Sequence, residues 1–251
     1  MCGGRGLRLR GEVEAPKPLV EIGGRPILWH VMMGFSHFGF EEFILCLGHR
    51  GDAIKEHFMR GEPWREGNFT LEVKGEGSTA LKPLSGRGWT VHFVETGLET
   101  PTGGRVKKVS WLLEGEPDFF VTYADTLSDV DLGRLLEFHR AHGRLATLTA
   151  VRPRLPFGLL SLSRDGRVRR FVEKPRMKSW INGGFFVFRR GVLDLLGPGD
   201  SLEQDLLPRL AREGELMAFR HEGFWASMDT YKDVLELNRL WEEGRAGWKV
   251  W

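Results

Sequence analysis

The sequence predicts an α/β protein with a mixed, mostly parallel sheet, helices on both faces of that sheet and a small antiparallel addition. Short apolar runs alternate with helical patterns through residues 26–151. Several of these runs are too continuously apolar for a sheet with one face in water, which is typical of parallel strands buried under helices. The 251 residues are enough for one large α/β domain, so we expect residues 1–251 to form a single domain.

The expected strands are short apolar segments bounded by turn residues. In the first part of the chain they are "EFILCLG" (Glu42 to Gly48), "WTVHFVETG" (Trp89 to Gly97), "DFFVTYAD" (Asp118 to Asp125) and "LATLTAV" (Leu145 to Val151). Helical spacing predicts helices over Pro26–Phe38, Asp52–Met59, Gly104–Leu113 and Leu132–His142, the last closed by Gly143. This alternation predicts crossover connections within one sheet.

Antiparallel pairing is expected in the second half of the chain. The Asp165-Gly166 pair inside "FGLLSLSRDGRVRRFVEKP" predicts a hairpin, and "INGGFFVFRR" predicts a further strand. Two capping-box patterns predict helices, one from Ser201 and Gln204 to about Arg212 and one from Thr230 and Asp233 to about Glu243. The stretch from Gly61 to Gly88 shows no clear pattern.

Composition narrows the classes of function. The chain carries 36 basic and 34 acidic residues, so its overall charge does not indicate nucleic-acid binding. No apolar run approaches the roughly 20 residues of a membrane span, and we expect a soluble, cytoplasmic protein that does not bind membranes. Cys2 and Cys46 form no CxxC pair, so neither a disulfide scaffold nor a zinc site is expected, and no histidine is assigned to catalysis.

The opening segment "MCGGRGLRLRGEVEAPKPLVEIGGRPIL" is rich in glycine and arginine. Backbone N–H groups at Gly3, Gly4 and Gly6, beside Arg8, are suited to binding a polyphosphate. Lys17, between two prolines, adds a point charge on a stiffened backbone. The spacing matches neither a P-loop nor a GxGxxG fingerprint, and a flexible basic terminus is the alternative.

Two aspartates follow expected strands. Asp125 ends the most apolar strand, where open α/β sheets place ligand chemistry, and Asp229 lies in "FWASMDTYKD" near the far end of the chain. Two such carboxylates suit one Mg²⁺, whose other ligands are substrate phosphates. Alternatively, Asp125 is a turn residue and Asp229 caps a helix.

Three further segments combine glycine with polar or charged residues. They are "FVEKP" with Glu173 and Lys174, "WINGG" with Asn182 and Gly183, and "TPTGGRVKK" with Gly103, Gly104 and Arg105. Residues of these types suit, in the same order, a phosphate, a sugar and an anion at the start of a helix. The alternatives, again in the same order, are an exposed ion pair, a turn before a strand and a plain helix N-terminus. The residues alone leave these alternatives open.

The order of "CGGRGLRL", "PKPLVEIGGRPIL", "TYAD", "FVEKP", "WINGGFFVF", "GFWASMDT" and "WKVW" resembles the nucleotidyltransferases that make nucleotide sugars, above all the glucose-1-phosphate cytidylyltransferases. The resemblance covers nearly the whole chain and is weakest from Gly61 to Gly88. It implies a Rossmann-like nucleotide-diphospho-sugar transferase fold, Mg²⁺ as cofactor, a homo-oligomer, and the reaction of CTP with α-D-glucose 1-phosphate to CDP-glucose and pyrophosphate.

The resemblance also implies a role for each matching residue. Gly3, Gly4, Gly6, Arg8 and Lys17 match the triphosphate-binding signature, and Gly103, Gly104 and Arg105 match a segment near the nucleotide. Asp125 and Asp229 match the Mg²⁺ ligands, Lys174 matches the sugar-phosphate lysine, and Gly158, Glu173, Asn182 and Gly183 match the sugar pocket. Arg8, Lys17 and Asp125 are therefore the expected catalytic residues.

The chain departs from the family pattern in several places. Leu7 stands where a small hydroxyl residue is usual, Thr126 stands where glycine is common, and "RMKS" replaces a glycine-rich loop. The family's glycine loop follows a central strand, which predicts a true start a few codons upstream of Met1. Two alternatives remain: a related nucleotidyltransferase that uses UTP, dTTP or GTP, and an inactive nucleotide-sugar-binding relative.

Overall fold

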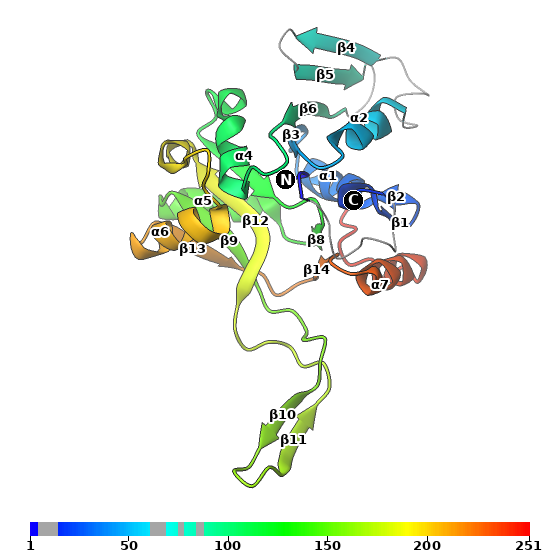
Figure 1. The fold of residues 1–251 in the computed structure, drawn as a ribbon, viewed down its shortest axis with the longest axis vertical. Coiled ribbons are helices and arrows are strands. Elements are labelled where there is room, and N and C mark those ends of the chain that lie inside the picture. Colours follow the sequence, from blue (N-terminus) through cyan, green and yellow to red (C-terminus); the bar gives the residue numbers. More distant parts are fainter. Residues whose placement is uncertain (5–14, 61–68, 75–77, 84–87) are drawn as a thin grey trace.

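The computed structural model describes residues 1–4, 15–60, 69–74, 78–83 and 88–251. Gly6, Leu7 and Arg8 lie outside the described residues, and the roles expected for them stay predictions. Figure 1 shows a body with a hairpin at each end, β4–β5 at the top and the longer β10–β11 at the bottom.

The centre of the body is a four-stranded sheet in the order β13-β9-β12-β7. Its strands are β7 (Asp118–Thr122), β9 (Ala146–Val151), β12 (Ile181–Arg189) and β13 (Leu216–Arg220). β13 runs parallel to β9, whereas β12 is antiparallel to both β7 and β9. The predicted mixed sheet is confirmed, but the expectation of mostly parallel pairing is wrong for it, because its longest strand, β12, is antiparallel to both neighbours.

A parallel pair of strands extends this arrangement. The pair consists of β3 (Glu42–Leu47) and β6 (Thr90–Glu95). The Cys2 N–H donates to the Cys46 carbonyl oxygen at 3.1 Å, and the Met1 amino group donates to the Thr122 carbonyl oxygen at 2.9 Å. Residues 1–2 therefore connect β3 with the end of β7.

Two short antiparallel pairs complete the described strands of the body. β8 (Thr126–Ser128) pairs with β14 (Trp225–Ser227), and β1 (Glu21–Ile22) pairs with β2 (Arg25–Pro26). The first of these pairs matters for the site, because its register places Thr126 opposite Ser227. Asp125 and Asp229 lie just beyond that end of the pair.

Helices cover both faces of β12, because successive residues of a strand point to opposite faces. Phe185 and Val187 belong to one buried cluster, and Phe186 and Phe188 belong to another. The first cluster contains residues of α1 (Ile27–His37), α5 (Leu132–His142) and α7 (Tyr231–Glu242); the second contains residues of α4 (Thr102–Lys108) and α6 (Leu207–Arg212). A third cluster packs α2 (Gly51–Arg60) against β3 and β6.

Most expected elements are confirmed within a few residues. α5 ends at Gly143, whose φ of 71° is the left-handed conformation that glycine adopts without strain. The capping box at the start of α7 is present, with Thr230 as its N-cap and Asp233 as its third helical residue. Local patterns therefore predicted these helix ends correctly.

Other elements differ from the prediction. The helix expected over Gly104–Leu113 is α4 followed by a separate 3₁₀ turn, Ser110–Leu113. Ser201 caps as expected, but a π-helical turn, Leu202–Leu206, precedes α6. Pro208 explains this turn, because it has no N–H to donate to the carbonyl four residues earlier. The stretch without a clear pattern contains β4 (Phe69–Lys74) and β5 (Ser78–Pro83), which pair as a hairpin.

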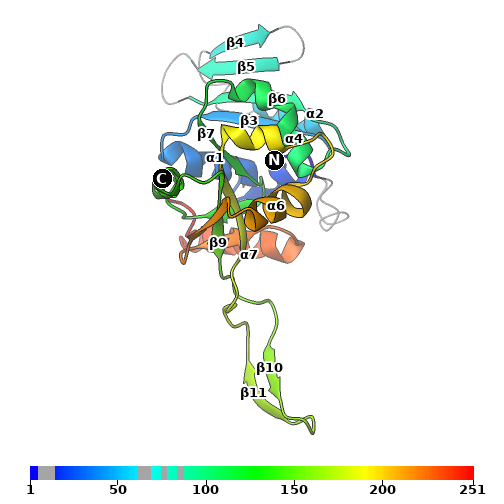
Figure 2. The same cartoon turned by 90° about the vertical axis from the view of Figure 1, so that its left-hand side faces the viewer.

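The hairpin predicted around Asp165-Gly166 forms a long projection, which we call the arm (residues 154–176). Its strands are β10 (Leu159–Leu162) and β11 (Val168–Val172), paired antiparallel. Figures 1 and 2 show from two directions that the arm leaves the body at the ends of β9 and β12. Among the described residues, no helix is long and apolar enough to cross a membrane.

Candidate active site

The site forms where three distant segments meet at one ammonium group. Lys17 Nζ lies 2.6 Å from Asp125 Oδ2 and 2.9 Å from Asp229 Oδ1. Lys17 starts a 3₁₀ turn between two prolines, Asp125 lies in the turn between β7 and β8, and Asp229 lies between β14 and α7. The structure thus brings together the lysine and both aspartates that the sequence analysis selected.

Backbone pairing holds the two carboxylates side by side. The Met228 N–H donates to the Asp125 carbonyl oxygen at 2.9 Å, which continues the β8–β14 pairing by one residue. Asp229 Oδ2 accepts a hydrogen bond from Ser227 Oγ at 2.7 Å. Since the N-cap of α7 is Thr230, the alternative that Asp229 caps this helix is excluded.

Lys17 carries its positive charge in this arrangement. Burial by itself lowers the pKa of Lys17, but the carboxylates of Asp125 and Asp229 outweigh burial and raise that pKa above its usual value. Its side chain is 15% exposed, against 26% for Asp125 and 40% for Asp229. The ammonium is therefore the most enclosed member of the cluster, and the carboxylates are open to solvent on one side.

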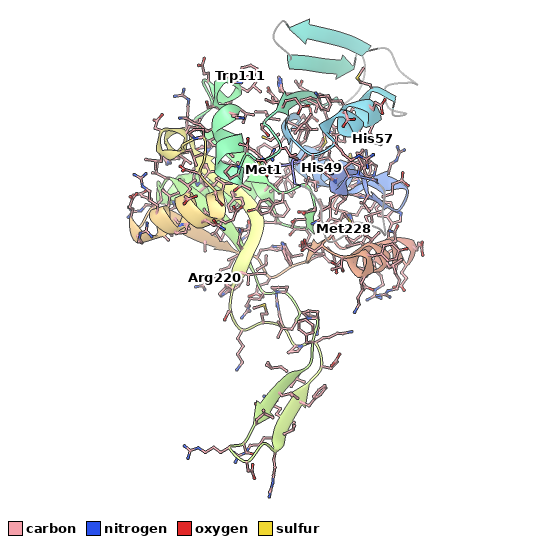
Figure 3. All side chains as sticks on the ribbon, in the orientation of Figure 1. Met1, His49, His57, Trp111, Arg220 and Met228 are labelled. Atoms are coloured by element: carbon pink, nitrogen blue, oxygen red, sulfur yellow. The ribbon has the colours of Figure 1, made fainter. Side chains whose placement is uncertain are left out.

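The first residues of the glycine-rich loop rest on a buried arginine. Arg105 Nη2 donates to the Gly3 carbonyl oxygen at 3.2 Å, and the His49 N–H donates to the same oxygen at 3.4 Å. A Cβ at Gly3 would overlap the Arg105 guanidinium and displace it from its present position, whereas Gly4 has open space around it. Figure 3 labels Met1 and His49, and also Met228, which precedes Asp229 in the chain.

The Arg105 guanidinium is buried and surrounded by neutral acceptors. Besides Gly3, it donates to the Leu47 carbonyl oxygen at 2.9 Å, to Thr96 Oγ1 at 2.6 Å and to the Leu98 carbonyl oxygen at 3.2 Å. Its exposed fraction is 6%. Arg105 was expected near the nucleotide, and the structure places it underneath the start of the loop, where it supports the backbone.

Gly103 and Gly104 lie at a tight contact between α4 and the loop before the π-helical turn. A Cβ at Gly103 would lie 2.6 Å from the Asp200 carbonyl oxygen, and one at Gly104 would overlap the Pro198 carbonyl oxygen. The Gly104 N–H donates to the Asp200 carbonyl oxygen at 2.8 Å. Close packing thus accounts for both glycines, and their contact with a nucleotide stays a prediction.

The residues expected in the sugar pocket fall into two groups. Asn182 and Gly183 lie in the body at the start of β12, where Trp225 Nε1 donates to the Gly183 carbonyl oxygen at 2.8 Å. Gly158, Glu173 and Lys174 lie in the arm, on either side of its hairpin. A Cβ at Gly158 would lie 3.1 Å from Glu173 Oε2, so these two residues are neighbours.

Sequence reasoning missed one polar pair beside the site. Tyr123, two residues before Asp125, donates from its hydroxyl group to Glu203 Oε1. Glu203 belongs to the π-helical turn, Leu202–Leu206, and such turns are frequent at functional sites. The only signal in the sequence was the Ser201 cap, which predicts a helix start and says nothing about Glu203.

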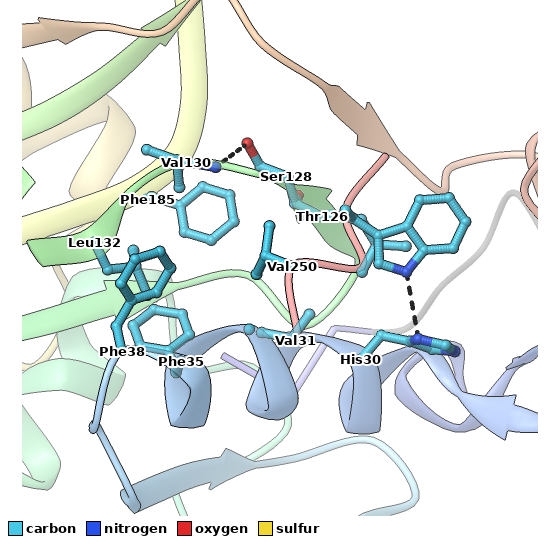
Figure 4. A pocket seen from close by; sticks show the side chains of 13 residues that line it. His30, Val31, Phe35, Phe38, Thr126, Ser128, Val130, Leu132, Phe185 and Val250 are labelled. Atoms are coloured by element: carbon cyan, nitrogen blue, oxygen red, sulfur yellow. Dashed lines mark hydrogen bonds between the residues drawn. The ribbon is translucent and has the colours of Figure 1, made fainter. Parts of the chain in front are cut away.

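A pocket elsewhere in the body is too small for a substrate. It lies between α1, β8 and the C-terminal residues, with Phe35, Phe185 and Val250 among its lining (Figure 4). Its volume of about 20 Å³ accommodates roughly one water molecule. The cluster of Lys17, Asp125 and Asp229 therefore remains the candidate site.

The candidate site has the composition of a simple cation site. Within the described ranges, no group of three or more His, Cys, Asp or Glu residues is arranged to hold a metal ion. Asp125 and Asp229 offer a pair of carboxylates instead. Mg²⁺ is commonly held by one or two carboxylates, with water and substrate phosphates as its other ligands, so the pair fits this ion.

The chain is similar to known proteins over its whole length. The chain is 43% identical to the glucose-1-phosphate cytidylyltransferase of Salmonella typhimurium, over 100% of this chain and 98% of the relative. It is 41% identical, with the same coverage, to the probable glucose-1-phosphate cytidylyltransferase of Bacillus subtilis. The crystal structure of HddC from Yersinia pseudotuberculosis, complexed with GMP-PN, has the same fold, with a TM-score of 0.70 at 22% identity over 96% of both chains.

The family model for nucleotidyl transferases matches residues 1–244 of this chain, a range that includes Lys17, Asp125 and Asp229. The cytidylyltransferase relatives align with this chain over nearly their whole length, so the match is not restricted to one motif. This chain therefore belongs to the nucleotidyl transferase family.

Proposed function

We propose that this protein is a glucose-1-phosphate cytidylyltransferase, which joins CTP and α-D-glucose 1-phosphate to give CDP-glucose and pyrophosphate. The observation that carries the choice of substrates is the identity of 41–43% to cytidylyltransferases over the full chain. The meeting of Lys17, Asp125 and Asp229 supports the type of reaction, because phosphoryl chemistry needs cationic groups at the reacting phosphates.

The residues of the site have few chemical tasks in this reaction. A sugar phosphate is largely ionised near pH 7, so its oxygen attacks the α-phosphorus of CTP without a general base. The P–O bond between the α- and β-phosphates breaks, and pyrophosphate leaves with the electron pair. In this proposal Lys17 offsets negative charge on the phosphates, and the backbone at Gly3 and Gly4 orients them.

We also propose that Asp125 and Asp229 hold Mg²⁺ during the reaction. The ammonium of Lys17 lies between one oxygen of each carboxylate, so the two side chains already converge on a single cation. When bound, Mg²⁺ supplies charge neutralisation at the phosphate oxygens. Since Lys17 fills the space between the carboxylates, a metal ion held by the same two oxygens would displace its ammonium group.

Self-association through the arm is a further part of the proposal. The arm exposes large apolar side chains, including Phe157 at 72%, Leu162 at 61% and Phe171 at 62%. A two-stranded hairpin with such a surface is marginally stable alone in water. We assign the arm to contacts with a second copy of this chain. Multi-angle light scattering should show an oligomer, and substitution of Phe157 and Phe171 by Ser should shift it toward the monomer.

The proposed cellular compartment is the cytoplasm. Cys2 and Cys46 are both free and buried, which suits a reducing environment. CTP and sugar phosphates are also cytoplasmic metabolites in general, so substrates and protein would share one compartment.

A pyrophosphate-release assay tests the function. Release should require CTP, glucose 1-phosphate and Mg²⁺ together, and its absence under these conditions would refute the proposed activity. Competition among CTP, UTP, dTTP and GTP in the same assay distinguishes a related nucleotidyltransferase. If calorimetry finds binding of CTP or CDP-glucose without turnover, the protein is an inactive relative.

A further inference from the structure

The longest strand of the central sheet is irregular beside the candidate site. Along β12, Asn182 pairs with Ala150 and Phe186 pairs with Leu148, so three residues of β12 lie opposite a single residue of β9. A bulge of this kind interrupts the hydrogen-bond ladder between two strands and turns side chains out of their regular alternation. Bulges are frequent next to active sites. We call residues 182–184 the bulge.

Side chains of β14, of β7 and of the bulge itself bind the backbone of the bulge. Trp225 Nε1 donates to the Gly183 carbonyl oxygen at 2.8 Å, and Thr122 Oγ1 donates to the Gly184 carbonyl oxygen at 3.0 Å. The Gly184 N–H donates to Asn182 Oδ1 at 2.9 Å. Because backbone groups that leave a ladder need other partners, these three hydrogen bonds stabilise one conformation of the bulge.

The bulge lies next to the carboxylate pair of the candidate site. A Cβ at Gly184 would lie 3.6 Å from Thr126 Oγ1, and this hydroxyl group donates to Asp125 Oδ1 at 3.3 Å. Trp225 lies in β14, two residues before the serine that donates to Asp229. Only the side chain of Thr126 therefore separates the bulge from Asp125.

The bulge presents a hydrogen-bond donor at this place. Gly183 and Gly184 are buried, and Asn182 is the exposed residue of the bulge. Since Asn182 Oδ1 accepts from the Gly184 N–H, the NH₂ group is the part of the carboxamide that can donate to a ligand. This group carries no charge, so it matches a hydroxyl group of a sugar better than a triphosphate, which binds cationic donors more strongly.

We propose that Trp225 is a positioning residue for glucose 1-phosphate: its indole N–H fixes the bulge, and the bulge directs the Asn182 NH₂ group to a hydroxyl group of the sugar. Thr122 acts on the bulge in the same way from β7. This inference rests on the proposed function. Neither Trp225 nor Thr122 is among the groups proposed to bind the triphosphate, so both affect the affinity for the sugar phosphate more than the affinity for CTP.

Steady-state kinetics of Trp225→Phe and Thr122→Val test the proposal. Trp225→Phe removes the indole N–H and keeps an aromatic ring, and Thr122→Val removes the hydroxyl group and keeps the branched shape. In each variant one carbonyl group of the bulge loses its side-chain donor. A misdirected hydrogen bond to the sugar corresponds to an increase in KM for glucose 1-phosphate of about 3- to 10-fold. The KM for CTP and kcat should stay within about twofold.

A control with a similar loss of stability separates positioning from folding. Lys107→Met removes a hydrogen bond of the same kind, from Lys107 Nζ to the carbonyl oxygen of Leu193 at 2.7 Å, and Leu193 belongs to the second buried cluster. All three variants should lower the melting temperature by about 2–4 °C. Lys107→Met should leave the KM for glucose 1-phosphate unchanged. An equal rise of this KM in Lys107→Met would show that lost stability is the cause, and the positioning role would be wrong.

A double variant tests whether Trp225 acts through Asn182. In an Asn182→Ala background there is no carboxamide left to direct, so Trp225→Phe should raise the KM for glucose 1-phosphate by less than about twofold further. If Trp225→Phe has its full effect on this KM in the Asn182→Ala background, action through Asn182 is wrong.

Failure of this inference is distinct from failure of the proposed function. If the wild type makes CDP-glucose and Trp225→Phe and Thr122→Val both keep its KM for glucose 1-phosphate, the positioning role is wrong and the function stands. If the wild type is inactive, calorimetry with glucose 1-phosphate replaces kinetics. A Kd that is about 3- to 10-fold weaker in Trp225→Phe would then still support the positioning role. An unchanged Kd, or no binding of glucose 1-phosphate by the wild type, would overturn it.

Discussion

Replacing Lys17 by Met should make this protein bind divalent cations more tightly when no nucleotide is present. In the structure, the Lys17 ammonium lies within 2.9 Å of both Asp125 and Asp229 and fills the space between them. A metal ion that uses the same two oxygens has to displace the ammonium first. Without Lys17, the two carboxylates repel one another, and a cation relieves this repulsion.

The size of the effect follows from the exposure of the groups. Asp229 is 40% exposed, and solvent screening therefore limits the stabilisation from each contact of the ammonium with a carboxylate to about 0.5–1 kcal/mol. Two contacts then cost a competing metal ion about 1–2 kcal/mol, and 1.4 kcal/mol corresponds to about tenfold in affinity. Lys17→Met should therefore bind Mn²⁺, used as a spectroscopic substitute for Mg²⁺, about tenfold more tightly than the wild type.

Electron paramagnetic resonance measures free Mn²⁺ directly and does not depend on turnover. Lys55→Met is the matched control, because Lys55 forms an ion pair with Glu95 away from the candidate site. A thermal-shift titration gives a second measurement: tenfold tighter binding adds about 3–6 °C to the metal-induced rise in melting temperature. Equal Mn²⁺ affinities for wild type and Lys17→Met would refute the reasoning, as would the same gain in Lys55→Met.

Three further predictions concern single residues. Asp229→Ala should lower kcat by at least about 100-fold in a pyrophosphate-release assay. Because Thr230, and not Asp229, caps α7, the same variant should lose only about 1 kcal/mol of unfolding free energy in urea denaturation. Near-normal turnover would remove Asp229 from the site. Arg105→Met leaves buried hydrogen-bond acceptors unpaired and should lower the unfolding free energy, measured by urea denaturation, by about 3 kcal/mol or more. An unchanged denaturation midpoint would show that the fold does not depend on Arg105. Burial lowers the pKa of His139 to about 4, so the unfolded chain binds a proton at this residue more readily than the folded chain does. The contribution of His139 to the unfolding free energy is therefore fully present above about pH 6.5 and falls by at most about 3 kcal/mol toward pH 4. His139→Gln should reduce this dependence of the unfolding free energy on pH.

The sequence predicted best where a local pattern determines the structure. The Thr230 and Asp233 capping box and the Gly143 cap lie where they were expected, since each depends on residues a few positions apart. The π-helical turn was missed, because a cap at Ser201 indicates a helix start without its hydrogen-bond spacing. The β4–β5 hairpin lies in a stretch where no periodicity was visible.

Prediction of the site depended on the family resemblance and could not supply its contacts. Asp125 and Asp229 were selected as a pair, but their approach results from the β8–β14 pairing, which joins distant parts of the chain. The position of Arg105 under Gly3 was not predictable, since a TGGR segment specifies neither the rotamer of its arginine nor what packs beneath the loop. Glu203 was missed for the same reason: two of its partners, Thr102 and Tyr123, come from distant segments of the chain.

The turn between β7 and β8 connects the two halves of the proposed site. The Thr122 carbonyl oxygen accepts a hydrogen bond from the Met1 amino group, and the Thr122 hydroxyl group donates to the Gly184 carbonyl oxygen at 3.0 Å. The end of β7 is therefore held from both sides. From this anchored strand, Tyr123 reaches Glu203, and Asp125 reaches Lys17. Because β12 also carries Asn182, this anchoring fixes the distance between Asp125 and that strand. In-line attack requires that fixed distance, because the sugar phosphate and the α-phosphate have to meet without rearrangement of the backbone between them.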